Sequence, residues 1–158
     1  MACQNNKGKF SPKSNNIILE KAMPAETCPC CSDKPFAKCC EPIINGTSNP
    51  KTVKQLMRAR FTAYRLGGHG QFLFNTWHPN YCQGLTPTSL SGKTHDWQSL
   101  DILQSSQQGD KGGVEFVAHY LDSSGQMHRH HEVSVFVRIK GRWFYTEGKV
   151  KITPVPAA

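Results

Sequence analysis

The chain of 158 residues has an ordinary apolar content and a formal net charge of +8 at pH 7. Its length suits one domain, or one domain with a small appendage. It contains no run of about 18 apolar residues, which excludes a membrane-spanning helix, and its polar N-terminal residues do not resemble a secretory signal. We therefore expect a cytoplasmic protein with no membrane partner, in which cysteine thiols stay reduced.

Positive charge is concentrated in the first part of the chain. Residues 1–60 hold ten Lys and Arg against four Asp and Glu, a net charge of +6, whereas residues 61–158 hold nine against seven, a net charge of +2. A basic surface attracts nucleic acid, ribosomes or acidic proteins without regard to sequence. No motif for reading bases accompanies it, so we expect no sequence-specific DNA binding. The alternative is a basic face that contacts only solvent.

The chain begins with a predicted tail and a cysteine cluster. Residues 1–27 are rich in Asn, Lys and Ser and lack hydrophobic periodicity, which predicts disorder. Residues 28–41 contain five of the seven cysteines, in the sequence CPCCSDKPFAKCC. The other two, Cys3 and Cys82, stand alone. An odd number of cysteines also suits a disulfide framework poorly.

A bound metal ion would explain why a reduced protein crowds its thiols, since isolated thiols would be exposed to oxidation. Zn²⁺ binds four thiolates in a closed tetrahedron, and Cys28, Cys30, Cys39 and Cys40 can close around one ion through the loop between the two pairs. Adjacent cysteines such as Cys39 and Cys40 can form a disulfide with each other only under strain. Redox chemistry of a dithiol and plain burial of the cysteines are the alternatives.

Two helices are predicted next. Apolar residues recur at helical spacing from Val53 to Tyr64, and Gly67-Gly68 ends this helix. A second short helix covers residues 72–77 and closes at Pro79. Residues 80–95 are rich in Pro, Thr, Gly and Ser, which predicts a loop with at most a short helical turn.

The remaining chain alternates with a period of two, which predicts strands over residues 97–106, 114–121, 126–139 and 142–148. Short turns join them into an antiparallel meander. The fold class is therefore α+β, with two helices packed on one face of the sheet. We place this domain at residues 50–148 and treat residues 149–158, which hold two prolines, as a C-terminal tail.

The third predicted strand has two different faces. His131, Val133, Val135, Val137 and Ile139 share one face, which we expect to lie in the core. His130, Glu132, Ser134, Phe136 and Arg138 share the other. The segment HRHH (128–131) places at most two histidines on one face, so we interpret it as a solvated strand end and not as a second metal site.

Three segments resemble the bacterial YchJ family: CPCCSDKPFAKCC, LMRARFTAYRLGGHGQFLFNTWHP (56–79) and GRWFYTEG (141–148). The first is similar to the SEC-C motif, a small zinc-binding module. The resemblance covers residues 28–148 and implies a SEC-C module followed by a cone-shaped, curved-sheet domain of the nuclear transport factor two-like fold. It brings no settled biochemical function.

Matched by position, the zinc ligands of the SEC-C motif fall on Cys28, Cys30, Cys39 and Cys40. The glycine that follows the second ligand in the family is Cys31 here. If this position requires a positive φ, a cysteine is strained there. Cys31 could also replace Cys30 as a ligand.

The first functional hypothesis is a zinc-binding protein that docks a protein or ribosome surface. Its contacts would be the basic residues Lys34, Lys38, Lys51, Lys54 and Arg58. A closed four-cysteine site leaves zinc no open position for water, so this reading favours a binding protein over an enzyme.

The alternatives place the function elsewhere. A pocket in the cone domain could bind a small molecule or perform general acid/base chemistry, with His78 and Glu132 as candidate groups. Against this, Glu132 could simply pair with Arg58 or Arg60, and His78 could cap a helix. A thiol or metal redox sensor, suggested by the spare Cys31, is the third hypothesis.

Overall fold

The computed structural model describes Cys3 and residues 26–157 of the chain. Short loops and helices come first, followed by four long strands. The helical elements, two of which are single-turn 3-10 helices (η), are η1 (Phe36–Lys38), α1 (Glu41–Ile44), α2 (Val53–Leu66), α3 (Gly70–Asn75), η2 (Pro79–Tyr81) and α4 (Pro87–Ser91). The strands are β1 (Asp96–Gln108), β2 (Lys111–Leu121), β3 (Met127–Ile139) and β4 (Arg142–Pro154).

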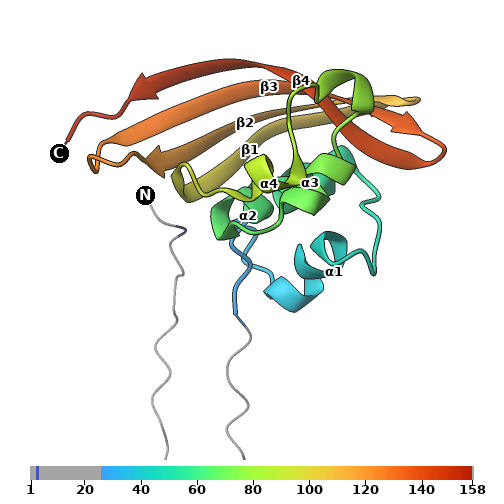
Figure 1. Cartoon of the computed structure of the whole chain (residues 1–158), viewed down its shortest axis with the longest axis horizontal. Coiled ribbons are helices and arrows are strands. Elements are labelled where there is room, and N and C mark those ends of the chain that lie inside the picture. Colours follow the sequence, from blue (N-terminus) through green and yellow to red (C-terminus); the bar gives the residue numbers. More distant parts are fainter. Residues whose placement is uncertain (1–2, 4–25, 158) are drawn as a thin grey trace, which may run out of the picture.

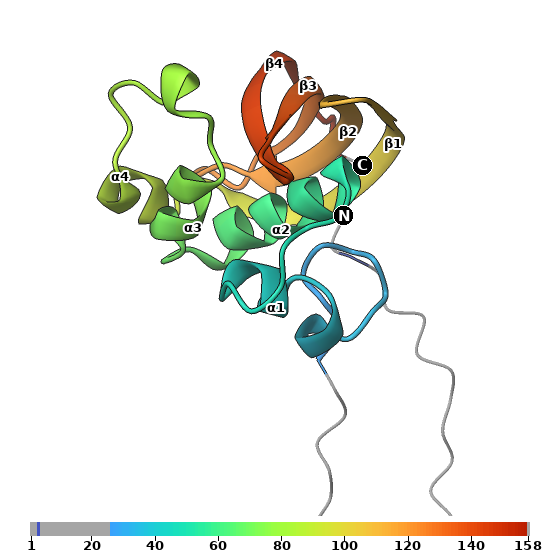
Figure 2. The same cartoon turned by 90° about the vertical axis from the view of Figure 1, so that its right-hand side faces the viewer.

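The four strands form one antiparallel sheet in the order β1-β2-β3-β4, so each strand pairs with its neighbour in the sequence. The sheet is curved, and α2, α3 and α4 lie together on one side of it (Figure 1). Figure 2 shows α1 and the loops before it on the far side of α2, away from the sheet. The predicted α+β class, with helices packed on one face of a curved antiparallel sheet, is confirmed.

Helix α2 lies between the sheet and the N-terminal loops. Its first turn is capped by Thr52, whose hydroxyl accepts a hydrogen bond from the amide of Gln55 at 3.1 Å. The helix ends at Gly67, whose φ of +71° favours glycine. Because α2 is covered on two sides, even Arg60 and Thr62 are buried, with 2% and 0% of their surface exposed.

The inner face of β3 is the opposite of the predicted one. Glu132, Ser134 and Phe136 are buried, whereas Val133 and Val135 are 46% and 45% exposed. Alternation shows which residues share a face, but the helices decide which face becomes the core. Here they cover the Glu132 side, where the polar side chains satisfy each other by hydrogen bonding, and the valines lie on the uncovered side.

The predicted C-terminal tail, residues 149–158, begins too early, because β4 continues to Pro154 and pairs with β3 along its length. Val150 and Ile152 alternate with lysines there, a pattern that suits a strand. Pro154 lies at the strand end, where a missing backbone donor is tolerated.

Some segments differ in detail from the prediction. The predicted loop over residues 80–95 holds part of η2 and all of α4, which has a capping box between Thr86 and Ser89. Of the predicted disordered tail, residues 1–27, all but Cys3, Glu26 and Thr27 lie outside the described residues. Within the described part of the chain, every helix is too short or too polar to cross a bilayer.

Candidate metal centre and neighbouring cavity

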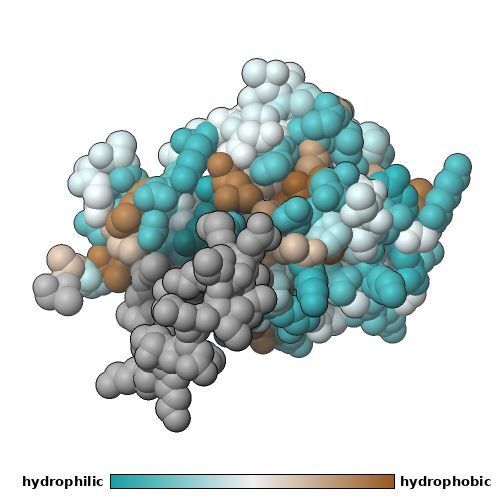
Figure 3. Space-filling view, turned by 90° about the horizontal axis from the view of Figure 1, so that it is seen from below, coloured by the Kyte–Doolittle hydropathy of each residue, from teal (hydrophilic) through white to brown (hydrophobic). Residues whose placement is uncertain are grey.

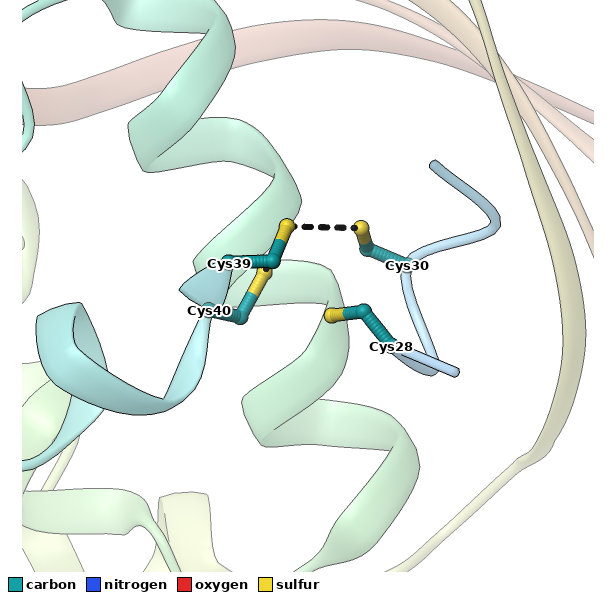
Figure 4. A group of neighbouring side chains, drawn as sticks. All are labelled: Cys28, Cys30, Cys39 and Cys40. Carbon is teal, nitrogen blue, oxygen red and sulfur yellow. Dashed lines mark hydrogen bonds between the residues drawn. The ribbon is translucent and has the colours of Figure 1, made fainter. Parts of the chain in front are cut away.

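Four cysteine side chains point toward one another between the N-terminal loops and α2 (Figure 4). Cys28 and Cys30 come from the first loop, and Cys39 and Cys40 come from the turn before α1. Their Sγ atoms all lie within 4.8 Å of one another. The Sγ separation is 3.7 Å between Cys30 and Cys39 and 3.9 Å between Cys39 and Cys40. The structure therefore assembles the four cysteines that the spacing predicted.

These separations fit a metal ion in tetrahedral coordination. A metal–sulfur distance of about 2.3 Å gives a tetrahedron with edges of about 3.8 Å, which matches both separations. Hydrogen bonding with Cys28 and Cys30, together with burial, raises the pKa of the Cys40 thiol. Hydrogen bonding with Cys30 and burial likewise raise the pKa of Cys28 to about 11. A nearby cation would therefore favour ionisation of the Cys28 and Cys40 thiols.

The first loop is a short hairpin that presents two of the ligands. The amide of Cys28 donates to the carbonyl of Lys34 and the amide of Phe36 to that of Glu26, both at 2.8 Å. The hairpin therefore includes Glu26 and Thr27, which lie before the predicted boundary at residue 28. Cys31, at the tip, has a φ of +64°, in the left-handed region that glycine tolerates best. The strain expected of a cysteine at this position is present.

Helix α2 supports the cluster from behind. Arg58 donates from Nη1 to the carbonyl of Cys30 at 2.8 Å, and the hydroxyl of Thr62 lies 4.0 Å from the Sγ of Cys28. Contacts of this kind orient metal ligands. The buried cysteines pack in the same apolar core as α2 and the sheet, so the cluster ties the N-terminal loops to the cone domain.

Cys31 does not join the cluster. It forms a disulfide with Cys3, so Cys30 is the neighbour that faces the other three cysteines. The pairing differs from the expectation that Cys3 stands alone and that all thiols are reduced. Cys82 is a free cysteine, as expected for one that stands alone in the sequence, and it is buried.

A basic hollow of about 470 Å³ lies beside the metal centre. Its walls include Lys34, Lys38, Lys54 and Arg58, and no Asp or Glu lines it. Four of the five predicted contact residues therefore meet at one place, and Lys51 is the exception. Figure 3 views the molecule from the side of α1 and shows hydrophilic residues spread over much of this face, with a few apolar ones between them.

A separate cavity of about 220 Å³ lies between α2 and the inner face of the sheet. Its apolar walls are largely aromatic, with side chains that include Phe61, Trp77, Trp97 and Phe116. Glu132 lines this cavity, but His78 does not. The Nδ1 of His78 instead accepts a hydrogen bond from the amide of Asn80 at 3.1 Å and so caps η2. The two candidate acid/base groups are not brought together.

Glu132 is paired with His130, a residue that sequence reasoning left out of the site. The Nε2 of His130 lies 2.8 Å from Oε2 of Glu132, and the hydroxyls of Ser134 and Tyr145 donate to Oε1 at 2.8 and 2.7 Å. Burial alone would raise the pKa of Glu132, but hydrogen bonds from His130, Tyr145 and Ser134 outweigh it and lower the pKa. The sequence did contain a signal for this pair, because His130 and Glu132 share one face of β3.

Arg60 supplies the positive charge in the cavity wall. Its Nη1 donates to the carbonyl of Leu73 at 2.8 Å, and its guanidinium lies over the ring of Trp77, 4.9 Å from the ring centre. Among the described residues, neither Arg58 nor Arg60 forms an ion pair with Glu132. The alternative in which Glu132 pairs with Arg58 or Arg60 is therefore wrong.

The other histidines of the HRHH segment have carboxylate partners of their own. The Nε2 of His128 lies 2.7 Å from Oδ2 of Asp122, and the Nε2 of His131 lies 2.8 Å from Oε1 of Glu115. In the part of the chain that the structure describes, the four cysteines are the one group arranged to bind a metal ion.

The fold and the site together define a small α+β protein with a cluster of four cysteines, able to bind a metal ion, packed against its helices. The model of the YchJ middle domain, which has the nuclear transport factor two-like fold, matches residues 52–148. The chain belongs to the YchJ family.

Relatives agree with this assignment over most of the chain. The chain is 37% identical over 129 residues to a UPF0225 protein of Serratia proteamaculans, covering 78% of this chain and 82% of that protein. It is 38% identical over 144 residues to a UPF0225 protein of Ralstonia nicotianae, covering 82% and 95%. The solution structure of a SEC-C motif containing protein from Rhodopseudomonas palustris superposes with a TM-score of 0.73 at 31% identity, covering 78% of this chain and 98% of that one.

Proposed function

We propose that this chain is a cytoplasmic zinc-binding protein whose N-terminal module docks an acidic protein surface. Four thiolates in a closed tetrahedron suit Zn²⁺, whereas Ca²⁺ and Mg²⁺ prefer oxygen ligands. Cys28, Cys30, Cys39 and Cys40 occupy every position of such a site, so the ion would fix the loops against α2 and would not activate water.

The basic hollow is the observation that carries the docking proposal. A zinc ion with four thiolates has a net charge of −2, and four cationic side chains, Lys34, Lys38, Lys54 and Arg58, surround the hollow beside it. The local charge is then about +2, with no carboxylate in the walls to offset it. Carboxylates of a partner protein complement this charge; the phosphates of ribosomal RNA are the competing occupant.

The test compares two double variants that change the net charge equally. Lys34→Glu with Lys38→Glu alters the hollow, and Lys149→Glu with Lys151→Glu alters exposed lysines on β4, on the uncovered side of the sheet. With polyglutamate as the probe at low salt, the first pair should weaken binding by roughly tenfold. The second pair should change it much less.

Equal losses in the two double variants would show a general charge effect without a local site, and would overturn the docking proposal. Co-sedimentation with purified ribosomes, without affinity for polyglutamate, would replace the protein partner with RNA. Metal analysis of the purified chain tests the zinc separately: anything other than one Zn²⁺ per chain would overturn that part.

A further inference from the structure

The cavity between α2 and the sheet has features of a ligand-binding site and is separate from the cysteine cluster. Its buried carboxylate has three hydrogen-bond donors around it, and room for that carboxylate depends on Gly148. A Cβ atom at Gly148 would collide with the Glu132 side chain. A charged side chain that is fixed by several hydrogen bonds beside aromatic walls is typical of a ligand site.

The size of the cavity limits the occupant to about one ring. A cavity of about 150 Å³ in another protein interior is large enough for benzene, and drug-sized ligands occupy about 300 Å³ or more. The present cavity of about 220 Å³ lies between these values. It can therefore hold a six-membered ring with a small substituent.

The walls favour a flat apolar molecule. Trp97 and Phe116 both flank His130, and the ring of Phe116 is stacked on the imidazole with 5.9 Å between ring centres. Trp77 and Tyr145 stand edge to face, 5.1 Å apart. Aromatic side chains in these arrangements offer both faces and edges to a further ring.

The charges in the cavity favour a neutral molecule. Arg60 contributes one positive charge and Glu132 one negative charge, and the other residues that line the cavity are His130, two tyrosines and apolar side chains. The Glu132 carboxylate would repel an anionic ligand, and the Arg60 guanidinium would repel a cationic one. Neither charge sign is favoured overall.

One acceptor position on Glu132 remains for a ligand. Oε1 accepts hydrogen bonds from Ser134 and Tyr145, whereas Oε2 has the single partner His130 among the described residues. An ionised carboxylate has about four lone-pair sites. A hydroxyl on the ligand can therefore donate to Oε2 without displacing a protein donor.

The inner face of the sheet continues past the cavity as an exposed apolar border. Val150 pairs with Glu132 and Ile152 pairs with His130 across β3 and β4, so all four side chains share the inner face. Val150 and Ile152 are nevertheless 49% and 48% exposed. The helices therefore stop short of this end of the sheet and leave an apolar border beside the Glu132–His130 pair.

We infer that this cavity is a binding site for a neutral, single-ring aromatic molecule of the phenol class, with its hydroxyl donating to Glu132 Oε2. The ring lies among the aromatic walls, and the apolar border formed by Val150 and Ile152 lies beside the Glu132–His130 pair.

The experiment is an NMR titration of the zinc-loaded full chain with two probes of equal size, phenol and toluene. Phenol should shift the resonances of cavity residues and saturate them, and toluene should bind roughly tenfold more weakly because it cannot donate a hydrogen bond to the carboxylate. Equal affinity for the two probes would overturn the assigned hydrogen bond. No saturable shift with either probe would overturn the site.

A cavity-filling variant locates the binding. Ala118 lines the cavity and is 1% exposed, so Ala118→Leu should occupy the space of the ring and abolish phenol binding. If the NMR spectrum of Ala118→Leu shows that this variant does not fold, Ala118→Val takes its place. Valine fills less of the cavity and should still weaken phenol binding. Undiminished phenol binding by a folded filled variant would place the phenol elsewhere and refute the inference.

Discussion

Gly148 of β4 leaves the space that the carboxylate of Glu132 on β3 occupies. A Cβ atom at Gly148 would overlap Oε1, Cδ and Cγ of Glu132. Gly148 has no positive φ that would require glycine, so its small size matters because of this neighbour. The same oxygen accepts the hydrogen bonds of Ser134 and Tyr145, and a displaced carboxylate would lose both.

Gly148→Ala should therefore lower the free energy of unfolding by about 1–3 kcal/mol, since the added methyl group overpacks a buried polar network. Urea unfolding measures the change. Gly113→Ala is the matched control on β2, because a Cβ atom there would meet its nearest neighbours at 3.5 Å and 3.6 Å, an ordinary contact. Similar destabilisation of both variants would argue against a special role for the space under Glu132.

Glu132 should make stability depend on acid pH. Its pKa is lowered in the folded state, so its contribution is fully present above the ordinary carboxyl value and is lost as pH falls through the lower, folded pKa. At neutral pH, Glu132→Gln should cost about 1.5–3 kcal/mol, because charge-assisted hydrogen bonds are lost. The difference between wild type and variant should narrow at acid pH in urea titrations. A difference independent of pH would contradict the assigned charge.

Removal of the metal ion should destabilise the whole cone domain and not the loops alone, because three of the ligands are buried in the core shared with α2. Cys40→Ser should abolish zinc binding and lower the unfolding temperature, as should a strong chelator on the wild type. Cys82→Ser is the control, since Cys82 is buried but remote from the cluster. A wild type whose unfolding temperature ignores chelation would show that the ion is dispensable for the fold.

The Cys3–Cys31 pair separates a covalent effect from backbone strain. Without reductant, Cys3→Ser should lower the free energy of unfolding by about 3–4 kcal/mol, as expected for a disulfide that joins residues 28 apart. Cys31→Gly should lower the free energy of unfolding by about 1 kcal/mol less than Cys3→Ser does, because glycine adopts the positive φ without strain. With reductant, Cys31→Gly should equal or exceed the wild type in stability. The measurement is denaturant unfolding under both conditions; identical behaviour of the two variants would mean that Cys31 is not strained.

Much of the fold followed from local patterns. Helical spacing around Leu56 and Phe61 indicated helices. Alternation after residue 96, interrupted by turns rich in glycine, indicated an antiparallel sheet after them, and the structure has this order. The cysteine cluster was also predictable from local spacing, because Cys28, Cys30, Cys39 and Cys40 lie in one short segment, which limits how they can meet. Such features depend on neighbours in the chain, which the sequence records directly.

The cavity depended on contacts between distant segments. The sequence pattern favoured the valine face of β3 as the core, and that prediction was wrong. Packing of the helices on the other side of the sheet placed Glu132 inward and Val133 outward. Packing also put His130 beside Glu132 in the cavity and left His78 to cap η2. The sequence by itself thus determined the elements and the cluster of four cysteines through local spacing. Tertiary structure decided which polar groups share the interior, because burial is a property of the assembled layers.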